Sequence, residues 1–219
     1  MRRRDVLLAL ISASFASRAV AQDAGGRLIV AVERGDLKGV TTALAQGAPV
    51  DSRDSRRRTA LLIATYRNDV AIARALIAAK ADVNAKDAIE DSPFLYAGAE
   101  GQTDILKMTL AAGADLRSLN RYGGTALIPA AHHGHVENVR VLLGTKIDID
   151  HVNKLGWTAL LEAVLLGDGG RAHTEIVRLL VERGAKLDLA DRDGVTPLAH
   201  ARARNQRAVV AILEKAGAR

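Results

Sequence analysis

Residues 125–130 read TALIPA, and stretches of the same kind recur along the chain at a step of 33 residues. They read TALLIA at 59–64, SPFLYA at 92–97 and TALLEA at 158–163, and TPLAHA follows at 196–201 after a longer step of 38. Each stretch places Thr or Ser before an apolar run. This pattern predicts a helix N-cap, because the hydroxyl accepts a hydrogen bond from a helical N–H that lacks a partner within the helix.

Two further series keep the same period. One stands where a first helix should end, and it consists of Gly35, Asn68, Gly101, Gly134 and Gly167. The other stands where a second helix should end, and it consists of Gly47, Lys80, Gly113, Lys146, Gly184 and Gly217. Glycine closes helices because it adopts the left-handed backbone easily, so a lysine with that backbone should cost about 1 kcal/mol. Pro129 falls in the first turn of its helix, where a missing N–H is best tolerated.

These stretches resemble the ankyrin repeat family, whose pattern runs D-x-x-G-x-T-P-L-H-x-A, then a glycine turn, then an apolar helix ending G-A-D-V-N. DRDGVTPL at 191–198 and GAD at 113–115 match it closely. The resemblance covers essentially everything after residue 21 and implies an all-α solenoid of about six helix-turn-helix repeats with short hairpin tips. The repeats should lie near residues 22–53, 54–86, 87–119, 120–152, 153–190 and 191–219.

More narrowly, TALIPAAHHGHVENV and LGWTALLEAVLLGDGG are similar to stretches of exported bacterial ankyrin proteins. The family resemblance implies a non-enzymatic module that binds a protein partner, and we expect it to be monomeric. Some exported relatives are associated with protection against oxidative stress, but this sequence offers no chemistry for that role.

The first 21 residues have the composition of a signal peptide. Arg2, Arg3 and Arg4 form a basic start, residues 6–16 are apolar but too short to span a bilayer, and Ala19-Val20-Ala21 fits a small-x-small cleavage site. We predict cleavage after Ala21 and delivery to a bacterial periplasm. The arginines also fit a twin-arginine signal, so the export route stays open, and an uncleaved amphipathic anchor is the alternative.

Removal of these residues would take four arginines and one aspartate, lowering the formal charge from +6 to +3. That weak surplus, without interleaved aromatic residues, argues against nucleic-acid binding. No other stretch approaches the length of a membrane span, and the chain has no cysteine. Packing alone must therefore stabilise the protein in an oxidising compartment.

In ankyrin repeats the hairpin tips and the exposed side of each first helix form a concave binding surface. Transferred residue by residue, this implies partner-binding roles for Arg56, Arg58, Tyr66, Ile89, Arg121, Tyr122, His132, His133, Leu155 and Trp157. Trp157, with Tyr122, Leu155 and Arg121, has the composition of an interface anchor. The alternative is that Trp157 only packs on the neighbouring hairpin.

The fifth repeat contains five extra residues between its two expected helices. We predict an insertion loop that includes Asp168, Gly169, Gly170, Arg171 and His173. Insertions in repeat proteins often lie on the binding face, and three glycines can form an anion-accepting turn. The alternative function is therefore small-ligand, anion or metal binding through this loop and the histidines, although the residues favour a plain surface insertion over a ligand-binding loop.

Several other patterns favour structure over chemistry. His132, His133 and His135 could ligate a metal, but adjacent helical residues point apart and Gly134-His135 matches the turn of the family, so we predict neither a metal site nor a cofactor. The basic run at residues 53–58 fits an acidic partner, an anionic membrane surface or a solvated hairpin tip. Glu162, Asp168 and His173 form the only acid/base cluster that repeat geometry suggests, and no catalytic motif is present, so we predict no enzyme activity.

Overall fold

The computed structural model describes residues 24–219, so the predicted signal peptide and its cleavage site lie outside the described residues. The chain divides into two compact bodies, which we call the N-terminal body (up to Ala88) and the C-terminal body (Ile89–Arg219). Each is described by itself. Within residues 24–219 every regular element is a helix, apart from an isolated bridge between Arg53 and Thr59. The predicted all-α class is confirmed, and none of these helices is long and apolar enough to cross a membrane.

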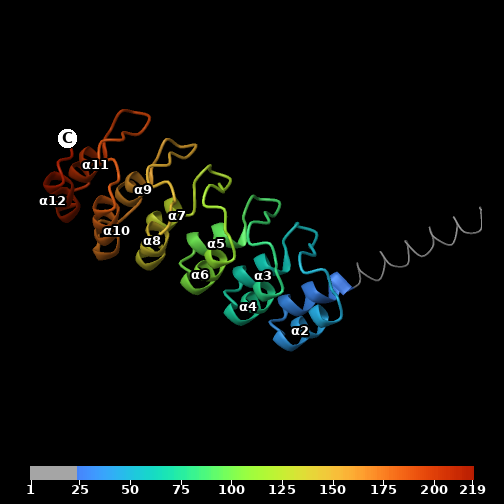
Figure 1. Cartoon of the computed structure of the whole chain (residues 1–219). Coiled ribbons are helices and arrows are strands. Elements are labelled where there is room, and N and C mark those ends of the chain that lie inside the picture. Colours follow the sequence, from blue (N-terminus) through green and yellow to red (C-terminus); the bar gives the residue numbers. More distant parts are fainter. Residues whose placement is uncertain (1–23) are drawn as a thin grey trace, which may run out of the picture. The chain divides into compact units, whose positions relative to one another are not determined.

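The N-terminal body pairs short helices (Figure 1). Residues 24–33 are helical, and the later helices are α2 (Leu37–Ala45), α3 (Ala60–Tyr66) and α4 (Val70–Ala78). Its core is aliphatic, because Leu28, Leu61 and Ile72 are fully buried. The side chain of Asp36 caps α2 by accepting a hydrogen bond from the N–H of Gly39 at 2.9 Å.

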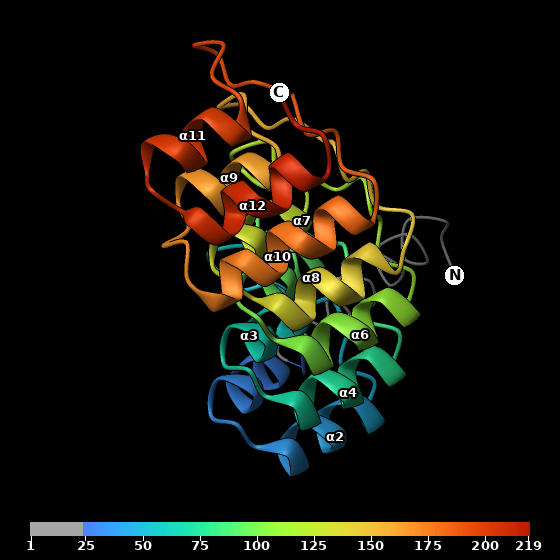
Figure 2. The ribbon, with the colours of Figure 1, turned by 90° about the vertical axis from the view of Figure 1, so that its left-hand side faces the viewer.

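The C-terminal body has two layers. The first helices of its repeats form one layer, and they are α5 (Pro93–Ala99), α7 (Leu127–His132), α9 (Ala159–Leu165) and α11 (Pro197–Ala203). The second helices form the other, and they are α6 (Thr103–Ala111), α8 (Val136–Leu143), α10 (Arg171–Glu182) and α12 (Arg207–Lys215). Within each layer successive helices pack together, which Figure 2 shows for the second helices. This stacking buries the apolar faces that a single helix pair would leave exposed.

Four of the five predicted N-caps are confirmed. The hydroxyls of Thr59, Ser92, Thr158 and Thr196 accept hydrogen bonds from the N–H three residues ahead at 3.2–3.3 Å. Thr125 does not, and its buried Oγ1 has no hydrogen-bond partner.

Pro129 explains this difference. In the fifth repeat the N–H of Glu162 donates to the carbonyl of Thr158 at 2.9 Å, but Pro129, at the equivalent position of the fourth repeat, has no N–H. The carbonyl of Thr125 instead accepts from the N–H of Ile128 at 3.3 Å, so that donor is not available to the hydroxyl. Pro129 does lie in the first turn of α7, as predicted, and the loss of the Thr125 cap is the local consequence.

Most residues of the two series predicted to end the helices have the expected positive φ, but two do not. Lys80 has a φ of 70°, as the series predicts, whereas Lys146 and Gly167 are not among the residues with positive φ. In the fourth repeat α8 ends early, and Thr145 closes the turn by donating its hydroxyl to the carbonyl of Leu142 at 2.6 Å. In the fifth repeat the left-handed position moves to Gly169, with a φ of 68°.

The extra residues of the fifth repeat are shared between a loop and a helix. Helix α10 has 12 residues where α8 has 8, and it begins at Arg171 with Gly170 as its N-cap. Arg171 and His173 therefore belong to a helix rather than to the predicted loop. The loop itself is short, because helix formation satisfies backbone groups that a longer loop would leave to water.

Candidate partner-binding groove

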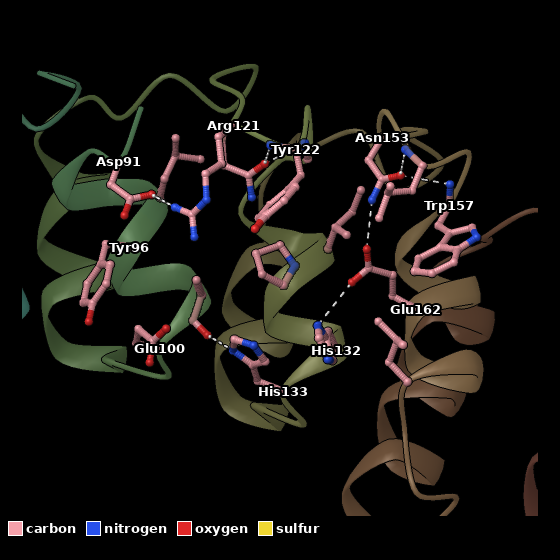
Figure 3. Close-up of a pocket in the computed structure, with 18 residues that line it drawn as sticks. Asp91, Tyr96, Glu100, Arg121, Tyr122, His132, His133, Asn153, Trp157 and Glu162 are labelled. Carbon is pink, nitrogen blue, oxygen red and sulfur yellow. Dashed lines mark hydrogen bonds and ion pairs between the residues drawn. The ribbon is translucent and has the colours of Figure 1, made fainter. Parts of the chain in front are cut away.

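A groove of about 410 Å³ runs along the C-terminal body, between the first helices of the third, fourth and fifth repeats and the hairpins before α7 and α9 (Figure 3). It is lined by Asp91, Leu95, Tyr96, Ala99, Glu100, Asn120, Arg121, Tyr122, Gly124, Ile128, Pro129, His132, His133, Asn153, Leu155, Trp157, Glu162 and Leu166. We call this the groove.

Six of the ten predicted partner-binding residues line the groove. They are Arg121, Tyr122, His132, His133, Leu155 and Trp157. Ile89 is 53% exposed but does not line it, and the other three lie in the N-terminal body. There Arg58 donates to Asp54 at 2.6 Å and the Tyr66 hydroxyl donates to Asp87 at 3.0 Å, so both side chains help to hold the local structure.

Hairpin tips fix the upper wall of the groove. Asn153 Oδ1 accepts hydrogen bonds from the N–H groups of Leu155 at 2.9 Å and Trp157 at 3.0 Å. Asn120 does the same for Tyr122 and Gly124. An Asx turn of this kind sets the backbone without help from a partner. The aromatic side chains therefore extend from a backbone whose conformation is fixed before a partner binds.

The exposed wall is apolar and aromatic. Tyr122 is 53% exposed and Leu155 is 45% exposed, while Trp157 is half-buried. Arg121 lies 4.9 Å from the centre of the Tyr122 ring and 3.5 Å from the Asp91 carboxylate. A cation over an aromatic face is favourable and holds both side chains in place.

The floor of the groove holds a buried carboxyl group. Glu162, on α9, has a side chain only 8% exposed, and its Oε1 accepts a hydrogen bond from Asn153 Nδ2 at 2.8 Å. Its Oε2 lies 3.6 Å from His132 Nδ1 (Figure 3). Burial raises the pKa of Glu162 from 4.5 to about 7, against the opposing effect of the Asn153 hydrogen bond. Sequence reasoning placed Glu162 in an acid/base cluster and missed both partners.

The three histidines lie closer together than the helical spacing predicts. The rings of His132 and His133, the C-cap of α7, are 4.6 Å apart, and those of His133 and His135 are 5.7 Å apart. His133 Nδ1 is 2.8 Å from the carbonyl oxygen of Ala99, and burial lowers the pKa of His132. Within residues 24–219 no group of three or more His, Asp or Glu side chains is arranged to hold a metal ion.

The insertion satisfies its own hydrogen-bonding groups. Asp168 Oδ1 accepts from the N–H of Gly170 and lies 2.8 Å from His173 Nδ1, while His173 Nε2 is 2.8 Å from the carbonyl oxygen of His132. Asp168 thus occupies the place that an external anion would take in this turn. No hydrogen bond or ion pair among the described residues joins Glu162 to Asp168 or His173, so the three do not form the cluster that repeat geometry suggested.

Known proteins share this architecture over most of the chain. The family model for ankyrin repeats matches residues 28–120, 94–187 and 148–219. An ankyrin repeat domain from Acinetobacter baumannii AYE has a crystal structure with a TM-score of 0.86 and 53% identity, covering 88% of this chain and 98% of that one. The ankyrin repeat protein EF0377 has a TM-score of 0.85 and 43% identity, covering 87% of this chain and 98% of that one.

A curated relative matches over a shorter region. The ankyrin repeat protein YahD of Escherichia coli K12 is 46% identical over 57 residues, which is 26% of this chain and 28% of YahD. The chain thus spans little more than a quarter of the length of that relative. Taken together, the family match and the two solved structures show that this chain belongs to the ankyrin repeat family.

Proposed function

We propose that this protein binds a protein partner through the groove and that it does so in the bacterial periplasm. Ankyrin repeats are typically protein-binding and generally non-enzymatic. The observation that carries the proposal is the groove itself, where the fourth and fifth repeats place the exposed side chains of Tyr122, Leu155 and Leu166 beside the half-buried Tyr96 and Trp157. Surfaces of this composition are typical of interface anchors.

A preformed support favours binding. The Asx turns at Asn120 and Asn153 hold the hairpins, and the contact of Arg121 with the Tyr122 ring restrains both side chains. A partner that docks here pays little for ordering these groups, so more of the contact free energy contributes to affinity.

A paired substitution tests the groove. We expect Tyr122→Ala with Trp157→Ala to reduce recovery of the partner from native extracts at least about tenfold, because these side chains are central anchors. The control is Val30→Ala with Leu37→Ala, which removes apolar side chains that are 43% and 41% exposed in the N-terminal body. If the groove variant keeps its circular dichroism spectrum and recovers partners as well as the control does, the proposal is wrong.

Export has its own test. The signal-like composition of residues 1–21 supports a periplasmic location. Fractionation of cells that express the full chain, followed by N-terminal sequencing, should recover a periplasmic protein that begins at Gln22. A protein that keeps Met1 in the cytoplasmic fraction contradicts this part of the proposal.

A further inference from the structure

Acidic groups outnumber basic groups in the groove. Its lining includes the carboxylates of Asp91, Glu100 and Glu162 and a single guanidinium, that of Arg121. Arg121 is already paired with Asp91 at 3.5 Å. No lysine or arginine among the described residues forms an ion pair with Glu100 or Glu162. Because Asp91 is paired with Arg121 and the pKa of Glu162 is raised to about 7, the negative excess of the groove comes from Glu100 and from the ionised form of Glu162, although the whole chain carries a positive formal charge.

Aromatic residues are concentrated in the same place. The chain contains three Tyr, two Phe and one Trp, and Tyr96, Tyr122 and Trp157 line the groove. The faces of aromatic rings attract ammonium and guanidinium groups, most strongly where water is partly excluded. Carboxylates beside aromatic rings thus form a surface complementary to a cationic side chain.

The hydrogen bond between Glu162 and Asn153 does not by itself explain why position 162 holds a carboxylate rather than a neutral side chain. In the sixth repeat the same two positions hold His200 and Asp191, whose Nε2 and Oδ2 atoms are 2.6 Å apart. A neutral glutamine at position 162 could accept the same bond from Asn153. Burying a carboxylate without a cationic partner costs free energy, and proteins often retain such destabilising groups at functional sites.

One oxygen of Glu162 is available for a ligand. Oε1 is used by Asn153 at 2.8 Å, but Oε2 lies 3.6 Å from His132 Nδ1, which is longer than a normal hydrogen bond. Burial also lowers the pKa of His132, so its ring carries little positive charge near neutral pH. The histidines of the other helices that pack on α9 contact other carboxylates, since His173 of α10 contacts Asp168 and His200 of α11 contacts Asp191. No arginine of α10 or α11 forms an ion pair with Glu162 among the described residues.

We propose that the groove recognises a basic segment of its protein partner, with an arginine or lysine side chain that contacts the aromatic wall and forms an ion pair with Glu162. This inference rests on the proposed function and adds the chemistry of the partner. Arginine fits well, because its planar guanidinium can stack on a ring while it donates hydrogen bonds to a carboxylate.

A peptide selection tests the chemistry of the partner. The full chain would be used to select from a display library of random 12-residue peptides, with the Tyr122→Ala and Trp157→Ala double variant as a counter-selection. We expect groove-dependent peptides that are enriched in arginine or lysine. Groove-dependent peptides without that enrichment overturn this inference and leave the proposed function standing. If no peptide binds in a groove-dependent way, the inference fails, and the partner-recovery experiment then decides the proposed function separately.

Calorimetry on one selected peptide tests the ion pair. Glu162→Gln keeps the acceptor for Asn153 but removes the charge, so we expect about a tenfold or greater loss of affinity. Glu137→Gln, which removes an exposed carboxylate from α8 outside the groove lining, should change affinity less than about twofold.

The peptide gives a second, independent variant. Replacing its basic residue with an uncharged analogue, citrulline for arginine, should weaken binding to the wild type by a similar factor and weaken binding to Glu162→Gln little further. If the citrulline peptide loses affinity equally for the wild type and for Glu162→Gln, the peptide arginine and Glu162 are not coupled, and the proposed ion pair is overturned.

Discussion

Pro129 changes the start of its own helix, and the effect is confined to a few atoms. Because proline offers no N–H, the carbonyl of Thr125 takes the donor that its hydroxyl would otherwise use. Thr125 then keeps a buried hydroxyl without a partner, whereas Thr158 caps α9 with the same group. Two residues of one type at equivalent positions thus have opposite effects on stability.

Matched substitutions expose this contrast. Thr125→Val should stabilise the protein by about 1 kcal/mol, because it removes an unsatisfied buried hydroxyl. Thr158→Val should destabilise it by about 1 kcal/mol, because it removes a working N-cap. Urea unfolding of both variants measures the difference. If Thr125→Val destabilises as much as Thr158→Val, the explanation through Pro129 is wrong.

The two lysines of the helix-closing series offer a second residue-scale test. Lys80 has a left-handed backbone with a φ of 70°, and Lys146 does not. Lys80→Gly should therefore raise the free energy of unfolding by about 1 kcal/mol, while Lys146→Gly should lower it slightly by adding chain entropy to the unfolded state. Thermal unfolding distinguishes them, and equal gains would contradict the assigned backbone.

Glu162 should make stability depend on pH. Burial raises its folded-state pKa from 4.5 to about 7, so the folded protein holds this proton more tightly than the unfolded chain. Its stabilising contribution is complete below about pH 4.5 and is lost as the pH rises to about 7. Relative to Glu162→Gln, the wild type should lose on the order of 2 kcal/mol across that window. A constant difference in unfolding free energy between the two proteins across this window would contradict the raised pKa.

At the scale of elements, polar side chains connect successive repeats of the C-terminal body. The Asn138 amide, on α8, donates to the carbonyl oxygens of Ala97 at 2.8 Å and Gly98 at 3.1 Å, at the end of α5. Its Oδ1 accepts from the Thr103 hydroxyl at 2.7 Å, at the start of α6. Gln206, the N-cap of α12, reaches back to the carbonyl oxygen of Val164 in the same manner.

Loss of such a connection should destabilise the stack. Asn138→Ala removes the donor to the Gly98 carbonyl and the acceptor of the Thr103 hydroxyl. The Ala97 carbonyl keeps the N–H of Gln102 at 3.0 Å, so we expect a loss of about 1–2 kcal/mol. Glu137→Ala, at the neighbouring exposed position, should change stability by less than about 0.5 kcal/mol. Denaturant unfolding measures both, and similar small effects would mean that packing alone joins these repeats.

The sequence predicts these elements far better than it predicts their connections. Period and N-cap pattern are local properties, and they locate the helices correctly. By contrast, the positions equivalent to Asn138 in the second, third, fifth and sixth repeats hold Ile72, Ile105, Ile176 and Val209, so the pattern predicts an apolar residue there. The extension of α10 was missed for a similar reason, since no residue in the insertion marks where the loop gives way to the helix.

At the scale of the whole molecule, repeat geometry predicts the groove and its aromatic wall but not the buried carboxyl group in its floor. Hairpin tips and first helices recur at fixed positions, which explains why Tyr122, His132 and Trp157 lie on one surface. The buried carboxyl was not predictable, because the position of Glu162 holds Ile63, Tyr96 and other unrelated types elsewhere. Its pairing with Asn153 depends on how a hairpin folds over a helix, which no periodic pattern encodes.

The central claim is that the groove, rather than another exposed apolar surface, contacts the partner. Site-specific photocrosslinking in cells tests it most directly. A photoreactive residue would replace Leu155 in the groove or Val30 outside it, since these side chains are 45% and 43% exposed. We expect a discrete crosslinked partner from position 155 and none from position 30. The same partner crosslinked from position 30 alone, with nothing from position 155, would contradict it.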